Sequence, residues 1–164
     1  MKMGLIIVQV IAAVFFAAVA KAGPLDFVRD QLGVNATNFP FGSSPSAFPQ
    51  FQKVKRVEQN PTEADYGYSL PSKSGPDREL TTTIFLHFTD NKLDWMEVST
   101  GGKERNDKLV AEFAKLSGID KKTITGPQPY EYSDGQYQLT YWGLCSASEN
   151  QAAIFRLTKV ETPK

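Results

Sequence analysis

The chain has 164 residues, with 18 Lys and Arg against 18 Asp and Glu, one His, one Cys and 41% hydrophobic residues. This composition fits one ordinary globular domain and excludes a disordered, collagenous or disulfide-rich chain. The balanced charge argues against nucleic acid as a partner, because such binding needs a concentrated basic surface.

The N-terminus has the pattern of a secretory signal peptide. Lys2 precedes an apolar run from Leu5 to Val19, and Ala20-Lys21-Ala22 follows it. A basic residue, a short apolar run and two small residues before the cleavage point define such a segment. We expect residues 1–22 to be a signal peptide cleaved after Ala22, because the run is shorter than the roughly 20 residues that span a bilayer. No stable membrane insertion is expected of the remaining 142 residues, which carry 16 basic and 18 acidic side chains.

Cysteine usage indicates the compartment and the source of stability. Cys145 is the only cysteine, so an intrachain disulfide is impossible. A chain of this length can instead be stabilised by a packed core. A signal peptide combined with almost no cysteine is typical of a bacterial periplasmic or secreted protein.

The mature chain divides into two zones that we expect to form a single domain. Residues 23–79 are rich in Pro, Ser and Gly, whereas residues 80–164 show clear periodicity. At the start of the first zone, Leu25, Val28 and Leu32 share a helical face, and the glycine that follows fits a left-handed helix cap. An extended reading of the same segment, with Leu25, Phe27 and Leu32 in a strand, stays open.

Two Phe-Pro segments follow, Asn38-Phe39-Pro40-Phe41-Gly42 and Ala47-Phe48-Pro49-Gln50-Phe51. Proline excludes a helix interior and favours extended chain. Exposed aromatic rings on irregular backbone are a common docking surface, which makes the four phenylalanines a candidate partner-binding site. The alternative is that these rings lie across the main sheet and join the core.

Alternating residues predict strands over 52–59, 64–70 and 80–89, and the last of these is the strongest in the chain. The turn Asp90-Asn91-Lys92 predicts a hairpin into a strand over 93–98. In the strongest strand the side chains that share one face are Ile84, Leu86 and Phe88, and those on the other face are Thr83, Phe85 and His87.

Helical spacing returns after Gly101-Gly102. Leu109, Val110, Phe113 and Leu116 repeat at that spacing behind Asn106-Asp107, a suitable N-cap, and Gly118 ends the segment. The segments 130–132, 137–144 and 152–160 then predict further strands, with Asp134-Gly135 as a turn. The order of elements predicts an α+β fold, in which an antiparallel sheet of hairpins has one main helix packed on one face.

These patterns carry a resemblance. The run Ile84–Val98, the helix ending at Gly118, and the segments Tyr130–Gly135 and Leu139–Tyr141 resemble small bacterial periplasmic α+β domains. The similar families are the outer-membrane assembly lipoproteins of SmpA/OmlA type and the β-lactamase inhibitor protein fold. This resemblance implies an interaction domain without catalytic residues. The chain departs from the lipoproteins because it lacks their lipidated cysteine.

Common catalytic signatures are absent from the sequence, which has no zinc, redox, nucleophile-elbow or phosphate-loop motif. We therefore expect no cofactor, no metal and no enzymatic activity. His87 is the one side chain that titrates near neutrality unaided, and a carboxylate such as Asp94 or Glu97 on the paired strand could orient it. A dyad of His87 with Cys145 is the catalytic alternative.

The second aromatic group lies in the strand over 137–144, where Tyr141 and Trp142 point to opposite faces. Tyrosine and tryptophan tolerate a half-wet surface, so both are candidate contact residues. The sequence predicts a secreted or periplasmic noncatalytic protein that binds another protein. The alternatives are a small secreted inhibitor or immunity-type protein and a small hydrolase that uses His87.

Overall fold

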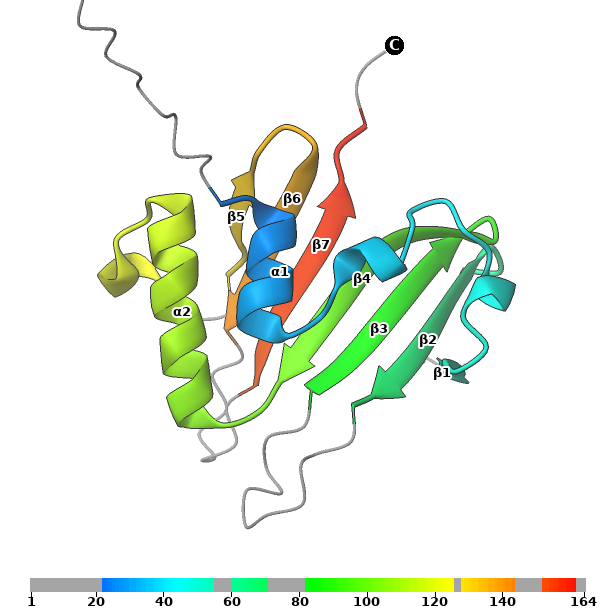
Figure 1. Cartoon of the computed structure of the whole chain (residues 1–164), viewed down its shortest axis with the longest axis horizontal. Helices are drawn as coiled ribbons and strands as arrows, with labels where there is room; N and C mark the ends of the chain where they lie inside the picture. The colour runs from blue at the N-terminus through cyan, green and yellow to red at the C-terminus, as the bar shows by residue number, and fades with distance from the viewer. Residues whose placement is uncertain (1–21, 55–59, 71–81, 126–127, 144–151, 162–164) are drawn as a thin grey trace, which may run out of the picture.

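The described residues form a seven-stranded antiparallel sheet with two α-helices (Figure 1), so the predicted α+β class is confirmed. The computed structural model describes residues 22–54, 60–70, 82–125, 128–143 and 152–161. The order of the strands across the sheet is β1-β2-β3-β4-β7-β6-β5. Residues 1–21 of the expected signal peptide and Cys145 lie outside the described residues.

The helices are α1, Pro24–Leu32, and α2, Lys103–Ser117. The strands are β1, Gln52–Val54; β2, Glu63–Ser69; β3, Thr82–Thr89; β4, Lys92–Thr100; β5, Tyr130–Ser133; β6, Tyr137–Gly143; and β7, Ala153–Lys159. Short 3₁₀ turns are formed by Ala36–Asn38, Pro45–Ala47 and Lys121–Thr123.

The central hairpin forms as the sequence predicts. Buried and half-buried residues alternate along the whole of β3, with Ile84, Leu86 and Phe88 on the buried side. Asp90 and Asn91 make the turn with φ values of 49° and 63°. Asp and Asn are the residues other than glycine that adopt this left-handed conformation most readily.

Two helices, instead of the single main helix that we expected, accompany the sheet. Figure 1 shows α1 lying over one face of the sheet, which we call the inner face, with α2 beside the β5 edge. The Phe27 ring of α1 lies 5.2 Å from Phe155 of β7, and the Phe113 ring of α2 lies 5.6 Å from Tyr141 of β6. Both α1 and α2, the helix that we expected to be the main one, therefore pack against the sheet.

The helical reading of the first segment is correct. Pro24 occupies the first turn of α1, where its missing N–H costs nothing, and Gly33 ends the helix with a φ of 73°. The extended alternative would have placed the adjacent residues Phe27 and Val28 on opposite faces. In the helix both are buried against the sheet.

The predicted start of α2 is wrong by one turn. The N-cap is Gly102, and Asn106 is already inside the helix. The Asn106 side chain is buried, and its Oδ1 accepts a hydrogen bond of 2.9 Å from Oγ1 of Thr100, the last residue of β4. The side chain therefore joins the helix to the strand before it and does not cap the helix.

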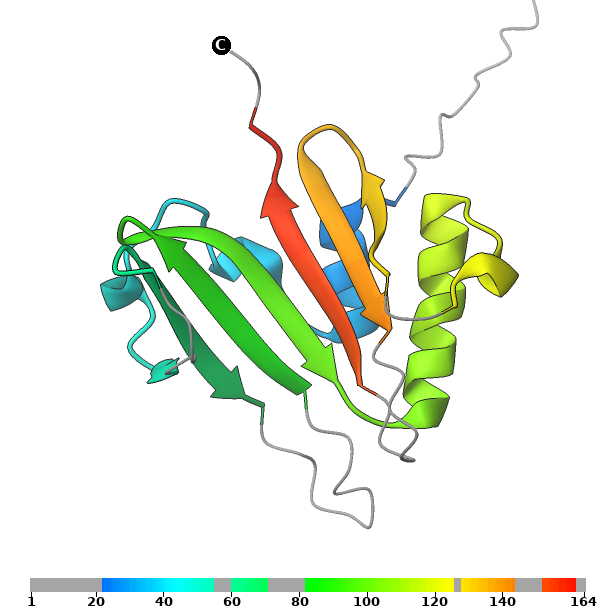
Figure 2. The same cartoon turned by 180° about the vertical axis from the view of Figure 1, so that it is seen from behind.

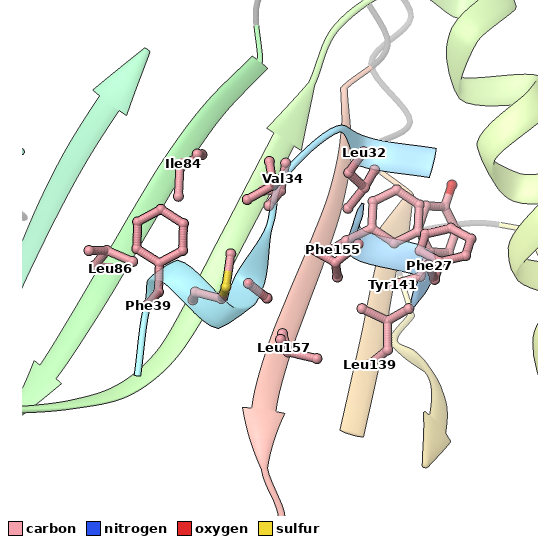
Figure 3. Packing of buried hydrophobic residues seen from close by; sticks show 14 of the residues in the cluster. Phe27, Leu32, Val34, Phe39, Ile84, Leu86, Leu139, Tyr141, Phe155 and Leu157 are labelled. Atoms are coloured by element: carbon pink, nitrogen blue, oxygen red, sulfur yellow. The ribbon is translucent and has the colours of Figure 1, made fainter. Parts of the chain in front are cut away.

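The Phe-Pro segments join the core, which corrects their assignment as a docking surface. Phe39, Phe48 and Phe51 are only 8%, 4% and 6% exposed, and their ring centroids lie 5.7–6.2 Å from one another. Phe39 is shown in Figure 3 among the buried side chains that include Ile84 and Leu86 of β3. Burying three rings is worth several kcal/mol, about 1.5–3 kcal/mol for each side chain, and it orders the long irregular segment.

Candidate binding face

The face of the sheet that is turned away from α1, which we call the outer face, carries no helix or strand among the described residues (Figure 2). Strand alternation decides which side chains lie there, because successive residues point to opposite faces. The inner set is buried beneath α1 and the Phe-Pro segments. The outer set includes Asp65, Phe85, His87, Trp95, Glu97, Thr140, Trp142, Ile154, Arg156 and Thr158.

One half of this face is built on a buried carboxylate. Asp65 of β2 and His87 of β3 are directly paired across the strands, and His87 Nδ1 lies 2.9 Å from Asp65 Oδ1. The side chains are only 2% and 12% exposed, respectively. The imidazole ring then stacks on Trp95 of β4, with centroids 4.4 Å apart and planes inclined by 8°.

In the other half of the face, the Arg156 side chain contacts two tryptophans and a glutamate. The guanidinium carbon of Arg156, on β7, lies 3.9 Å from the centroid of Trp95 and 4.7 Å from that of Trp142 on β6. Arg156 Nη2 also donates to Glu97 Oε2 at 3.2 Å. Arginine favours such a site because its flat guanidinium can stack on rings and still donate to a carboxylate.

Together these contacts form a continuous row across five adjacent strands, which we call the ladder: Asp65, His87, Trp95, Arg156 and Trp142. The row follows from the sheet register. Asp65 faces His87 and His87 faces Trp95, whereas Arg156 faces Glu97 and leans diagonally toward Trp95. Both ring faces of Trp95 are thereby covered.

The electrostatics of the ladder are nearly balanced. Each acidic side chain has a basic neighbour, Asp65 with His87 and Glu97 with Arg156. Arg156 Nε is buried and has no hydrogen-bond partner among the described residues. Asp65 and Glu97 are therefore both buried and hydrogen-bonded, while Trp95 and Trp142 are half-buried on the same face.

A second apolar patch adjoins the ladder at the β1 side. Phe85 of β3 lies over Gly67 of β2, where an added Cβ would meet Phe85 Cε1 at 3.3 Å and Val54 Cγ2 at 3.1 Å. A larger residue here would have to push one of these two side chains aside, so glycine suits the close approach. The patch extends the apolar surface beyond His87.

The residues expected to bind a partner are separated by the fold. Trp142 is half-buried on the outer face, as alternation predicts, while Tyr141 is 6% exposed and packs 5.0 Å from Phe155 in the core. Phe41 is half-buried near Tyr137, with the ring centroids 6.0 Å apart. Of the six predicted contact residues, only Phe41 and Trp142 are therefore more than marginally exposed.

The carboxylate that orients His87 was predicted on the wrong neighbouring strand. Asp94 accepts instead from Thr89 Oγ1 at 3.2 Å, across the hairpin turn, and Glu97 pairs with Arg156. Asp65 takes the role because β2 pairs with β3 in that register. Alternation along β2 would have indicated the face on which Asp65 lies. Its partner on β3 depends on the register between these two strands, which the sequence that connects them does not fix.

No cluster of three or more His, Cys, Asp or Glu that could hold a metal ion occurs among the described residues. Within the same part of the chain, no helix is long and apolar enough to cross a membrane. No family model, no curated protein and no solved structure matches the chain. The resemblance to periplasmic α+β domains therefore stays a prediction.

Proposed function

We propose that the protein is an exported, noncatalytic interaction module of the bacterial envelope that binds another protein through its outer face. The observation that carries the proposal is the ladder, which places two tryptophans and an arginine side by side on a sheet face that no described element covers. Tryptophan and arginine are the residues most enriched among those that dominate binding energy at protein interfaces.

The geometry favours a protein over a sugar or a nucleic acid. Ligands that stack need a free aromatic face, and Trp95 has His87 on one face and Arg156 on the other. Nucleic acid would also need uncompensated basic charge, whereas Arg156 is paired with Glu97. A protein partner can use the exposed ring edges and the one-third-exposed, ring-stacked guanidinium of Arg156.

The experiment is capture from the envelope and secreted fractions of the native host by a chain that begins at Gly23. Three baits are compared: wild type, Trp142→Ala on the outer face and Phe41→Ala on the opposite side. Trp142 ends the ladder, so its removal leaves the Asp65, His87 and Trp95 contacts in place. We expect one partner that wild type and Phe41→Ala retain and that Trp142→Ala binds at least about 30-fold more weakly, which corresponds to roughly 2 kcal/mol.

Circular dichroism and the thermal midpoint show whether each bait is folded. A partner lost with Phe41→Ala and kept with Trp142→Ala would move the interface to the helix side and contradict the proposal. Equal capture by all three folded baits would also contradict it. If the captured partner is an enzyme whose activity falls on binding, the protein is of the inhibitor type.

A hydrolase remains the second candidate because His87 has an oriented ring. A carboxylate hydrogen-bonded to Nδ1 is the arrangement that fixes the tautomer of a general base. The described contacts of His87 are with Asp65 and Trp95, and neither of these side chains is a hydroxyl or thiol that the imidazole could deprotonate. Ester or peptide hydrolysis by wild type that His87→Ala abolishes would favour this candidate over the interaction module.

A further inference from the structure

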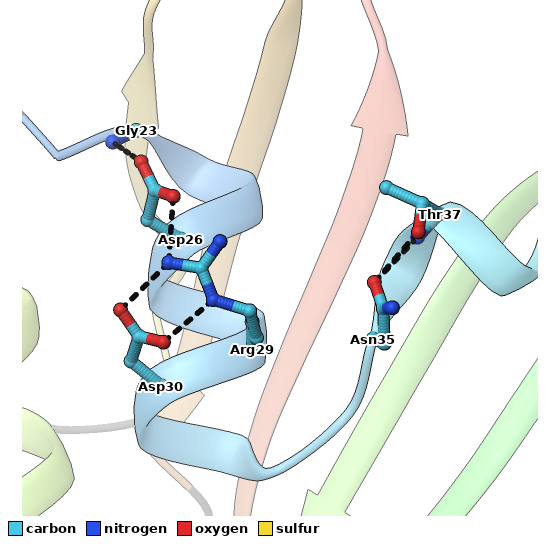
Figure 4. Close-up of polar contacts among 6 residues, drawn as sticks. All are labelled: Gly23, Asp26, Arg29, Asp30, Asn35 and Thr37. Carbon is cyan, nitrogen blue, oxygen red and sulfur yellow. Dashed lines mark hydrogen bonds and ion pairs between the residues drawn. The ribbon is translucent and has the colours of Figure 1, made fainter.

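The backbone nitrogen of Gly23 is held by an acidic side chain. It donates to Asp26 Oδ2 at 3.0 Å at the start of α1 (Figure 4), which is one half of a capping box, since glycine has no side chain to supply the other half. Asp26 also pairs with Arg29 at 2.9 Å through its other oxygen. Pro24 is buried at the first helical position, and a proline disfavours the helical conformation of the residue before it, in agreement with the ψ of 179° at Gly23.

A second carboxylate reaches the same residue from the turn between β5 and β6. Asp134 Oδ1 accepts hydrogen bonds from the backbone N–H groups of Gln136 and Tyr137, at 2.9 Å and 2.8 Å. These bonds hold the carboxylate with its Oδ2 close to the point where a Cβ of residue 23 would stand. Two acidic side chains from distant parts of the chain thus meet at one backbone position.

This approach explains the glycine. A Cβ at residue 23 would lie 2.8 Å from Asp134 Oδ2, closer than real contacts of that kind. The φ of Gly23 is −103°, a value that any residue adopts, so backbone conformation does not require glycine here. The requirement is space for the Asp134 carboxylate.

We propose that proteolytic processing between Ala22 and Gly23 creates an α-ammonium group at Gly23 that Asp26 and Asp134 bind together. Hydrolysis by an exported-protein peptidase adds one water, leaving a carboxylate on Ala22 and an ammonium on Gly23. The uncut amide has a single N–H, which donates to Asp26. The ammonium has three donors and a positive charge, enough to serve both carboxylates. The inference rests on the proposed export of the chain.

The surrounding charges support this assignment. Among the described residues, Arg29 is shared between Asp26 and Asp30, and Lys115, which lines the same pocket as these two carboxylates, is paired with Glu112. The two hydrogen bonds from Arg29 lower the pKa of the Asp30 carboxyl, so that side chain stays ionised. A positive group at a helix N-terminus opposes the helix dipole. Two adjacent carboxylates offset that cost.

The test is a thermodynamic cycle measured by thermal unfolding. Chains that begin at Gly23 are compared with chains that begin at Ala22, in which the ammonium is displaced by one residue and Gly23 keeps a neutral amide. Each start is combined with Asp134 and with Asp134→Asn, which keeps Oδ1 for the turn. The core of the described residues lies after Gly23, so both chains contain it. Asp90→Asn, in the exposed β3–β4 turn, is the matched control.

We expect the chain beginning at Gly23 to melt roughly 2 to 4 °C higher than the chain beginning at Ala22. Asp134→Asn should remove at least half of that difference, and Asp90→Asn should leave it unchanged. Mass spectrometry of the protein from its host should find Gly23 as the first residue. Equal midpoints for the two starts, a difference that Asp134→Asn does not reduce, or another first residue in the host would overturn the proposal. The cycle measures only thermal midpoints. Its result therefore does not depend on whether the capture experiment finds a partner protein.

Discussion

Arg156 is the residue on which the outer face depends most. It supplies the contact between two tryptophans and also the partner of the buried Glu97. Periodicity alone places Arg156 on the outer side of β7, opposite its buried neighbours Phe155 and Leu157. It cannot show that the guanidinium lies between two rings, because those rings come from strands β4 and β6, which flank β7 only in the folded sheet.

The substitution Arg156→Lys distinguishes the contribution of the positive charge from that of the planar guanidinium. Lysine keeps a positive charge for Glu97 but loses the planar group that stacks on both tryptophans. We expect the free energy of unfolding to fall by about 1 kcal/mol in urea titrations. Trp95 and Trp142 are the only tryptophans of the chain, so their emission spectrum should change as well.

Arg29→Lys is the control for this substitution. Arg29 lies on α1 with a mostly exposed side chain and pairs with exposed carboxylates. The urea midpoint and the tryptophan emission of Arg29→Lys should match those of wild type. An Arg156→Lys protein with wild-type stability and wild-type emission would show that stacking of the guanidinium does not stabilise the face.

At the scale of single elements, the sequence is most informative where period and turn chemistry agree. β3 and its hairpin are predicted because strict alternation runs into an Asp-Asn turn. The start of α2 is predicted wrongly because Asn106-Asp107 has the composition of a cap. A cap and a buried helical asparagine have the same residue type, and only the partner of the side chain distinguishes them.

Two alanine substitutions separate these roles of the asparagine and the aspartate. Asn106→Ala removes the acceptor of the buried Thr100 hydroxyl, so we expect a loss of about 1–3 kcal/mol in the free energy of unfolding. Asp107→Ala changes an exposed side chain within the helix, so we expect a change within about 0.5 kcal/mol. Urea titrations of both variants measure this difference. The reverse ranking would restore Asp107 as the cap.

The arrangement of the whole molecule was the least predictable part. The α+β class follows from the order of elements, but the strand order β4-β7-β6-β5 places the last strand of the chain beside the fourth. The burial of Phe39, Phe48 and Phe51 depends on the same arrangement, because they cover the inner face formed by distant strands. A local pattern of Phe and Pro is compatible both with an exposed docking loop and with a segment packed on the sheet, so the sequence alone does not distinguish the two.

The same arrangement gives the molecule two unlike sides, one covered by α1 and the Phe-Pro segments and one, the outer face, on which no described helix or strand lies (Figures 1 and 2). Site-specific photo-cross-linking in the native host tests the role of the outer face most directly. The photoreactive residue is placed at Thr83, Ser99 or Thr158 on the outer face, or at Gln31 or Lys115 on the helices. The account predicts protein adducts from the outer positions and none from the helix positions. Adducts from the helix positions alone would contradict the assignment of the outer face as the binding surface.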